Sequence, residues 1–140
     1  MTLFELLLIA QLIASAAMTG VVWIVQLAIY PLFARVGPAE FEDVHARYMF
    51  RVSLVIMPLM AIEALTCAAC FFMGDKLALL APSILFGIIC ASTAFIQVPQ
   101  HNSLTIESVP ALVRGNWIRT IAWTLRTGLL ALLLINLAQS

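Results

Sequence analysis

The chain has 140 residues, of which 64% are hydrophobic and only 10% are charged. Soluble domains carry roughly 25% charged residues, so this composition excludes the polar surface of an ordinary water-soluble protein. Lysine plus arginine and aspartate plus glutamate number seven each, and this balance excludes the basic surface of a nucleic-acid-binding protein. At this length there is room for one bundle, so residues 1–140 are expected to form a single domain.

The apolar residues are gathered into four long runs. A membrane-crossing helix needs about 20 mostly apolar residues, because a rise of ~1.5 Å per residue must span ~30 Å of hydrocarbon. Barrel strands would alternate apolar and polar residues, whereas runs such as Leu-Leu-Leu-Ile-Ala at 6–10 are continuous. The sequence therefore predicts an all-α fold, a membrane-embedded antiparallel four-helix bundle with helices at about 3–33, 41–73, 77–101 and 110–138.

The first helix carries polar residues near its carboxyl end. Trp23, Gln26 and Tyr30 recur at helical spacing, so they share one face. The helix is expected to end near Tyr30-Pro31, because proline disfavours helical geometry in the residue before it. A Gly37-Pro38 turn then leads into the second helix.

The second helix begins with acidic residues, which suit the positive end of a helix dipole. His45 and Tyr48 follow within its first turns, and Pro58 predicts a kink further along. Glu63 lies much deeper in the apolar run. Cys67 and Cys70 are interpreted as small packing residues.

Gly74, Asp75 and Lys76 form the tight connection to the third helix. That helix ends with Gln97 and His101, and Asn102 follows in a polar link that reaches Pro110. Both connections are short, which favours antiparallel neighbours.

The fourth helix combines polar and aromatic residues at helical spacing. Asn116, Arg119, Trp123 and Arg126 share one stripe, and Trp117 lies beside it. Polar stripes that face lipid are costly, so those of the first, third and fourth helices are expected to converge inside the bundle.

These stripes predict a pocket in the half of the bundle that carries the 1–2 and 3–4 connections. The expected catalytic residues are His45, His101, Asn116 and Arg119. The expected ligand-binding residues are Trp23, Gln26, Tyr30, Tyr48, Gln97, Asn102, Trp117 and Trp123.

Structural interpretations of the same residues stay open. The histidines suit the headgroup level, and Arg47, Arg51 and Arg114 suit lipid phosphates. Tyr30, Tyr48 and Trp117 suit an interfacial aromatic belt. Gln26, Gln97 and Asn116 suit interhelical hydrogen bonds. Glu63 and Arg126 are expected to form a structural ion pair between the second and fourth helices, with a proton or ion relay as the alternative.

Arginine placement predicts orientation in the membrane. Arg35, Arg47, Arg51, Arg114 and Arg119 lie at the end with the 1–2 and 3–4 connections, while Lys76 lies at the opposite end. Positive loops stay inside, so both polar loops of this multi-pass cell-membrane protein are expected to be cytoplasmic.

Short motifs carry a family resemblance. Val98-Pro99, Asn102, Leu104 and then Asn-Trp-Ile-Arg-Thr at 116–120 with Trp123 and Arg126 resemble the anthrone-oxygenase-like family of small four-helix membrane proteins. The first hairpin agrees through Tyr30-Pro31, Phe41, His45, Tyr48 and Pro58. Fungal members oxidise anthrones to anthraquinones, while most bacterial members have no assigned function. The resemblance implies a small oxygenase acting on a flat apolar molecule, anthrone- or quinol-like, at His45, His101, Asn102, Asn116, Trp117 and Arg119.

Such chemistry needs no metal. A base, His45 or His101, removes a proton, and the resulting carbanion reacts directly with oxygen. Arg119 and Asn116 would stabilise the oxyanion. No cofactor is therefore predicted, and haem or a transition metal on His45 and His101 is the alternative.

The expected partners are the lipid bilayer and a small apolar aromatic ligand, without nucleic acid. A second alternative is a non-catalytic subunit of a larger membrane complex or a homo-oligomer, in which the polar end of the bundle meets a partner.

Overall fold

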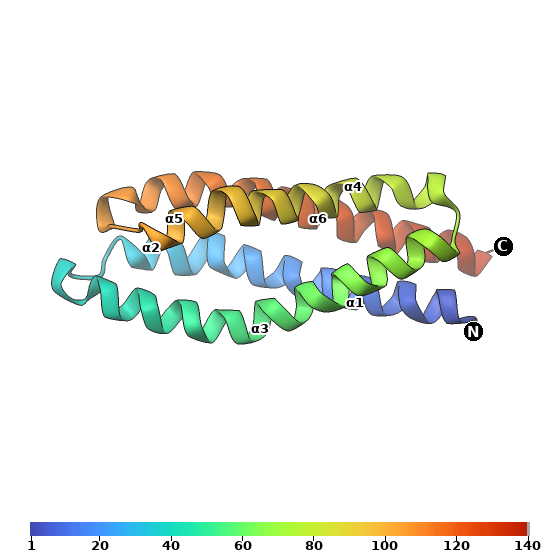
Figure 1. The fold of residues 1–140 in the computed structure, drawn as a ribbon, viewed down its shortest axis with the longest axis horizontal. Coiled ribbons are helices and arrows are strands. Elements are labelled where there is room, and N and C mark those ends of the chain that lie inside the picture. Colours follow the sequence, from blue (N-terminus) through green and yellow to red (C-terminus); the bar gives the residue numbers. More distant parts are fainter. Residues whose placement is uncertain (140) are drawn as a thin grey trace.

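The computed structural model describes residues 1–139, which form four antiparallel helical rods and no strand (Figure 1). The first rod joins α1 (Leu3–Ile24), η1 (Val25–Ile29) and α2 (Tyr30–Phe33), and the second is α3 (Pro38–Met73). The third rod joins α4 (Lys76–Ser92), η2 (Thr93–Gln97) and α5 (Val98–Asn102). A short η3 (Ile106–Ser108) leads into α6 (Val109–Gln139). The predicted all-α four-helix bundle is confirmed.

The bundle has two distinct ends. Both termini and the turn at 74–75 lie at one, which we call the terminal end, and the connections at 34–37 and 103–105 lie at the other, the loop end (Figure 1). Local signals explain the boundaries. The Thr2 hydroxyl and the Glu5 carboxylate form a capping box at the start of α1, and the Asp75 carboxylate accepts from the Leu77 N–H at 2.9 Å. A β-carbon on Gly74 would come within 3 Å of the Phe4 ring and the Leu79 side chain, so glycine lets these side chains pack closely against the turn.

Pro31 and Pro99 both lie inside their rods. The first rod ends at Phe33, as in the predicted span 3–33, and continues past the Tyr30-Pro31 step at which proline chemistry alone placed the end. A π-helical turn precedes each: η1 lies before Pro31, and η2 lies before Pro99. The Tyr30 N–H bonds the Val25 carbonyl, and the Val98 N–H bonds the Thr93 carbonyl, each five residues back. The wider turn moves the preceding carbonyls away from the proline ring, so the helix continues.

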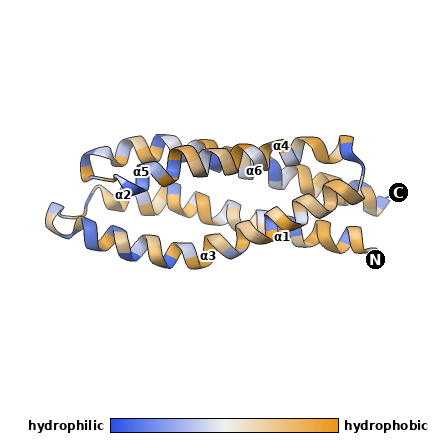
Figure 2. Cartoon of the chain, in the orientation of Figure 1, coloured by the Kyte–Doolittle hydropathy of each residue, from blue (hydrophilic) through white to orange (hydrophobic). Residues whose placement is uncertain are grey.

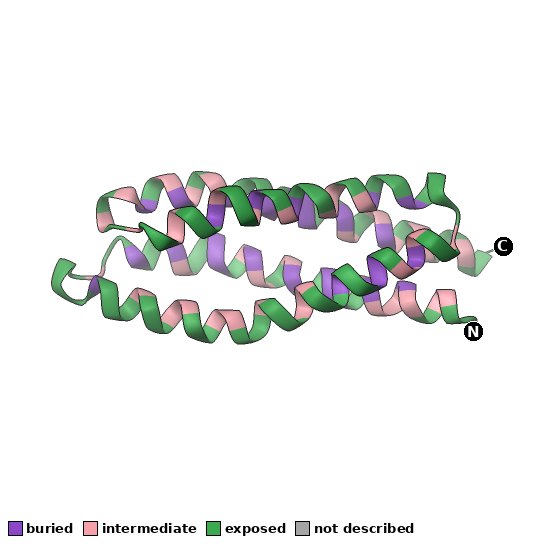
Figure 3. Cartoon of the chain, viewed as in Figure 1, coloured by how far each residue is buried: buried purple, intermediate pink, exposed green. Residues whose placement is uncertain are grey.

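Many exposed positions along the rods are apolar, and the buried positions combine an apolar core with polar residues such as Gln26, Glu63 and Arg126 (Figures 2 and 3). Four spans are long and apolar enough to cross a membrane: Leu3–Phe33, Pro38–Met73, Lys76–Asn102 and Ile106–Gln139. Large apolar side chains such as Phe95 and Phe72 are 81% and 78% exposed. Apolar faces of this size suit contact with a lipid bilayer.

Packing is uneven along α3. Its terminal half buries Glu63, Thr66, Cys67 and Cys70, whereas no residue from 42 to 62 is buried. The helix bends near its middle (Figure 1), the region that contains Pro58. The loop half of α3 therefore covers the other rods loosely.

Candidate functional site

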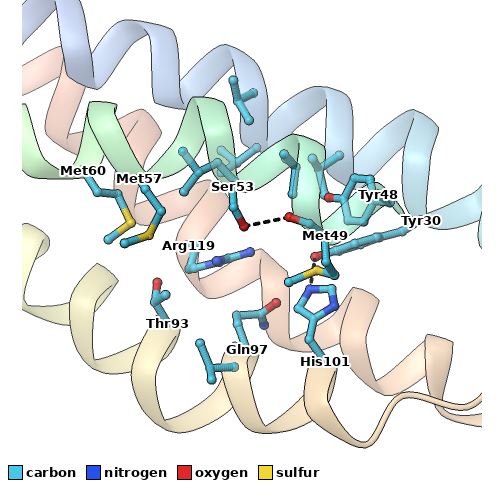
Figure 4. A pocket seen from close by; sticks show the side chains of 16 residues that line it. Tyr30, Tyr48, Met49, Ser53, Met57, Met60, Thr93, Gln97, His101 and Arg119 are labelled. Atoms are coloured by element: carbon cyan, nitrogen blue, oxygen red, sulfur yellow. Dashed lines mark hydrogen bonds between the residues drawn. The ribbon is translucent and has the colours of Figure 1, made fainter. Parts of the chain in front are cut away.

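A cavity of about 120 Å³ lies between the loop half of α3 and the other rods (Figure 4). Aliphatic and methionine side chains form most of its wall. Its polar lining consists of Tyr30, Tyr48, Ser53, Thr93, Gln97, His101 and Arg119. No aspartate or glutamate is among these lining residues. The volume is close to the ~150 Å³ of a cavity that takes up benzene.

Arg119 is buried at the cavity wall and is held by neutral groups. Its Nε donates to the Asn116 Oδ1 at 3.0 Å, and its Nη2 donates to the same oxygen. The Asn116 Nδ2 in turn donates to the Gln26 Oε1 at 2.8 Å. Within residues 1–139, salt bridges join Arg47 to Asp43 and Arg126 to Glu63, and none involves Arg119. The guanidinium therefore has the Asn116 amide and the Tyr30 hydroxyl as partners, and no counter-ion among residues 1–139.

The two histidines contact each other beside this cavity. The His45 Nε2 and the His101 Nδ1 are 2.9 Å apart, and the rings stack with centroids 5.2 Å apart. The Tyr30 hydroxyl lies 3.4 Å from the His101 Nε2. Phe41 stacks on His45 with an interplanar angle of 4°, so the outer ring is held between its neighbours.

A second, more open cleft of about 510 Å³ lies at the loop end. His45, Asn102, Glu42 and Glu107 line it, and His101 lines both this cleft and the cavity. The histidine pair therefore forms the wall between the two spaces.

The structure brings together most of the expected polar residues. Tyr30, Tyr48, Gln97, His101 and Arg119 line the cavity directly. Gln26 and Asn116 stand behind Arg119 in the amide network. His45 and the exposed Asn102 belong to the outer cleft.

The three tryptophans, expected to bind ligand, lie outside the lining of the cavity. Trp23 and Trp117 pack edge to face with centroids 5.6 Å apart, and the Trp23 Nε1 donates to Thr124 at 3.0 Å. Trp123 is fully buried, and its Nε1 donates to the Glu63 Oε1 at 2.9 Å.

Glu63 and Arg126 form a separate buried cluster. The Arg126 Nε donates to the Glu63 Oε2 at 2.9 Å, and its Nη1 donates to the Pro82 carbonyl at 2.6 Å. The guanidinium lies over the Phe86 ring, 4.7 Å from the centroid. The Arg126 guanidinium thus has an ion-pair partner, two hydrogen-bond acceptors and an aromatic ring around it. These contacts fit a structural ion pair.

Sequence reasoning missed the methionine side of the cavity. Met49, Met57 and Met60 line it from α3, with Ser53 between them (Figure 4). Their spacing of eight and three residues places them on one helical face. In an apolar run, however, methionines are usually interpreted as packing residues. The polar Ser53 on the same face is the only signal that could have indicated a cavity there.

The histidine pair has the geometry of a hydrogen bond. Two nitrogens on one tetrahedral zinc ion would be about 3.3 Å apart, given Zn–N bonds of roughly 2.0–2.1 Å. The observed 2.9 Å is shorter. Across the described residues, no group of three or more His, Cys, Asp or Glu side chains is placed to hold a metal ion.

Comparison of the chain with family models, curated proteins and solved structures finds no significant match. The functional proposal therefore depends on the geometry of the site. Its elements are an apolar cavity, an arginine without a counter-ion and a pair of hydrogen-bonded histidines.

Proposed function

We propose that this chain is a multi-pass protein of the cell membrane and a small cofactor-independent oxygenase, similar to the anthrone-oxygenase-like family. Its substrate is a small aromatic molecule with an acidic O–H or C–H group, of the anthrone or quinol type. The observation that carries the proposal is the buried Arg119 guanidinium, which has no carboxylate partner in the described part of the chain and lies in the wall of an apolar cavity beside His101.

The charge on Arg119 favours an anionic occupant. A buried cation without a counter-ion is costly, and the neutral Asn116 amide offsets only part of that cost. A ligand that becomes an oxyanion inside the cavity supplies the missing charge. Apolar walls exclude water and strengthen this attraction.

The histidines supply the base. The acidic proton of the substrate passes to His101 through the Tyr30 hydroxyl, which lies 3.4 Å from the His101 Nε2. Arg119 holds the negative charge that remains on the substrate oxygen. The electron-rich ring carbon then bonds O₂, and a proton taken up again through the Tyr30–His101 pair completes a hydroperoxide. For an anthrone, whose acidic ring carbon is a CH₂ group, loss of water from the hydroperoxide converts CH₂ and O₂ into C=O and H₂O, so atoms and electrons balance without a further reductant.

Cavity size bears on the substrate class. About 120 Å³ suits a single ring, and drug-sized pockets begin at roughly 300 Å³. Met49, Met57 and Met60 are unbranched and flexible, so rotation of these side chains can enlarge the cavity for two or three fused rings. Single-ring phenols and quinols are therefore expected to bind most readily.

The proposal is tested with a panel of phenols, quinols and anthrones on the purified protein in nanodiscs. We expect oxygen uptake that matches carbonyl product, and Arg119→Leu should reduce it by about 10²-fold or more because the oxyanion loses its charge partner. Arg47→Gln, which removes an exposed cation at the same end, is the matched control.

Two results would contradict the proposed cofactor-independent oxygenase. Unchanged ligand binding and oxygen uptake in both Arg119→Leu and His45→Ala would exclude this site and favour a role as a subunit of a larger assembly. A Soret band or a stoichiometric transition metal in the same sample would replace the cofactor-free chemistry with ligation by His45 and His101.

A further inference from the structure

The imidazole ring of His101 separates the inner cavity from the outer cleft. His101 lines the inner cavity and also the outer cleft, whereas His45 lines the outer cleft alone. Tyr30 is almost completely buried and lines only the cavity. A hydrogen-bonded path therefore crosses the wall between cavity and cleft through Tyr30, His101 and His45.

We propose that Tyr30, His101 and His45 form a proton relay that carries the acidic proton of a bound ligand from the cavity to the outer cleft. This inference rests on the proposed function only in requiring that the cavity binds an ionisable phenol-like molecule. It assigns His45 a role without ligand contact, since His45 is outside the cavity lining.

The hydrogen bonds define how the proton moves. The relay starts from the tautomers in which the Tyr30 hydroxyl donates to the His101 Nε2, the His101 Nδ1–H donates to the His45 Nε2, and the His45 Nδ1 carries a proton. The separations of 3.4 and 2.9 Å allow both hydrogen bonds in this direction. The ligand proton passes to the Tyr30 oxygen as the Tyr30 proton passes to the His101 Nε2. The Nδ1 proton of His101 then moves to His45, and the Nδ1 proton of His45 leaves to water. Both rings end neutral with reversed tautomers, and one proton has been released.

The surroundings favour this path. The ring of His45 is held by Phe41 stacked on it and by Phe33 edge-on, with centroids 6.1 and 5.9 Å away. Fixed rings keep the two nitrogens at 2.9 Å, the distance that proton transfer needs. Glu42 and Glu107 line the cleft into which the proton is released.

If His45 only holds His101 in position, substitutions at position 45 should have a different effect than if His45 transfers a proton. A glutamine at position 45 can still accept a hydrogen bond from the His101 Nδ1, but it cannot take a proton at one atom and release one at another. His45→Gln therefore separates positioning from transfer. His45→Ala removes both and leaves space in the cleft for free imidazole.

The probe is 4-nitrophenol, a single-ring phenol whose anion is coloured. Protein in nanodiscs is saturated with it and then subjected to a rapid pH jump, and absorbance follows the proton on the bound phenol. We expect relaxation in His45→Gln and His45→Ala to be at least tenfold slower than in the native protein. Binding affinity should change by less than about twofold, because His45 does not line the cavity. Added imidazole should restore the rate in His45→Ala but not in His45→Gln.

The outcomes separate the two proposals. Native relaxation rates in His45→Gln, or slow relaxation in His45→Ala that imidazole leaves unchanged, would overturn the relay while leaving the oxygenase proposal intact. A relay with these properties would stand even if no substrate in the panel consumed oxygen. If 4-nitrophenol does not bind the native protein, both proposals fail. Arg47→Gln should relax at the native rate, and slowing there would overturn the relay.

Discussion

At the scale of single residues, the two buried arginines of α6 stand in opposite situations. Arg126 has a carboxylate, a backbone carbonyl and an aromatic ring around it. Arg119 has an amide network and a cavity. The same side chain is thus part of the fold in one place and, in our proposal, part of a binding site in the other.

The ion pair makes a prediction about stability. Glu63→Gln should destabilise the bundle by about 3–5 kcal/mol, because it leaves the Arg126 charge buried without a counter-ion. The double variant Glu63→Leu with Arg126→Met removes both charges and should recover most of that loss. Reversible unfolding in mixed micelles, followed by circular dichroism, measures both. A double variant less stable than Glu63→Gln alone would show that the pair is not the source of the effect.

Spacing along α6 explains which site residues the sequence could predict. The convergence of Gln26, Asn116 and Arg119 followed from helical periodicity and from the cost of polar groups in lipid. Helical periodicity does not show how far a cavity extends along the bundle axis. Trp123, one turn beyond Arg119, lies outside the cavity lining and donates to the Glu63 carboxylate. Trp117 is two residues before Arg119, about 200° around the helix, and is 38% exposed.

At the scale of the elements, the π-helical turns were beyond sequence reasoning. The rule that proline disfavours helix in the preceding residue predicted an end at Tyr30, and the extra residue in η1 removes that conflict. The continued rod then places Phe33 against Phe41 and Tyr48, with ring centroids 6.0 and 5.0 Å away. The second π turn, η2, likewise precedes the segment that carries His101.

The loose packing of α3 suggests a route for the ligand. Met57 on α3 and Val98 on α5 both line the cavity and are exposed on the outer surface. Their position opens the cavity sideways toward the apolar surroundings of the bundle. An apolar phenol already dissolved in the bilayer would then enter between α3 and the third rod.

Blocking this opening should slow binding. Met57→Trp is expected to lower the association rate of 4-nitrophenol in nanodiscs at least fivefold, because a larger ring fills the gap. Leu54→Trp is the matched control, since Leu54 is also exposed on α3 but does not line the cavity. Stopped-flow absorbance gives both rates. Equal slowing in the control, or slowing only by Thr105→Trp in the outer cleft, would place the entrance elsewhere.

At the scale of the whole molecule, composition and run length were sufficient for the fold class. Four apolar runs with short connections allow few arrangements, and the antiparallel bundle is the simplest. Orientation depends on a weaker signal. Arg35, Arg47, Arg51 and Arg114 are exposed at the loop end, while Arg119 is buried and does not act as a loop charge.

Four exposed arginines against the single Lys76 still predict that the loop end faces the cytoplasm. The prediction is tested by cysteine labelling, with Gly37→Cys and Ser103→Cys in the loop-end connections and Asp75→Cys in the opposite turn. The native Cys67, Cys70 and Cys90 are first replaced by alanine, so that each introduced thiol is the only one.

With a membrane-impermeant maleimide on intact cells, Asp75→Cys should react, while Gly37→Cys and Ser103→Cys should react only in inside-out vesicles. The physical reason is that positively charged connections are retained on the cytoplasmic side during insertion. Labelling of Asp75→Cys from the cytoplasmic side would reverse the assignment. The answer also sets the direction of the proposed relay, because the outer cleft lies at the loop end. A cytoplasmic loop end means that the proton taken from the ligand is released into the cytoplasm.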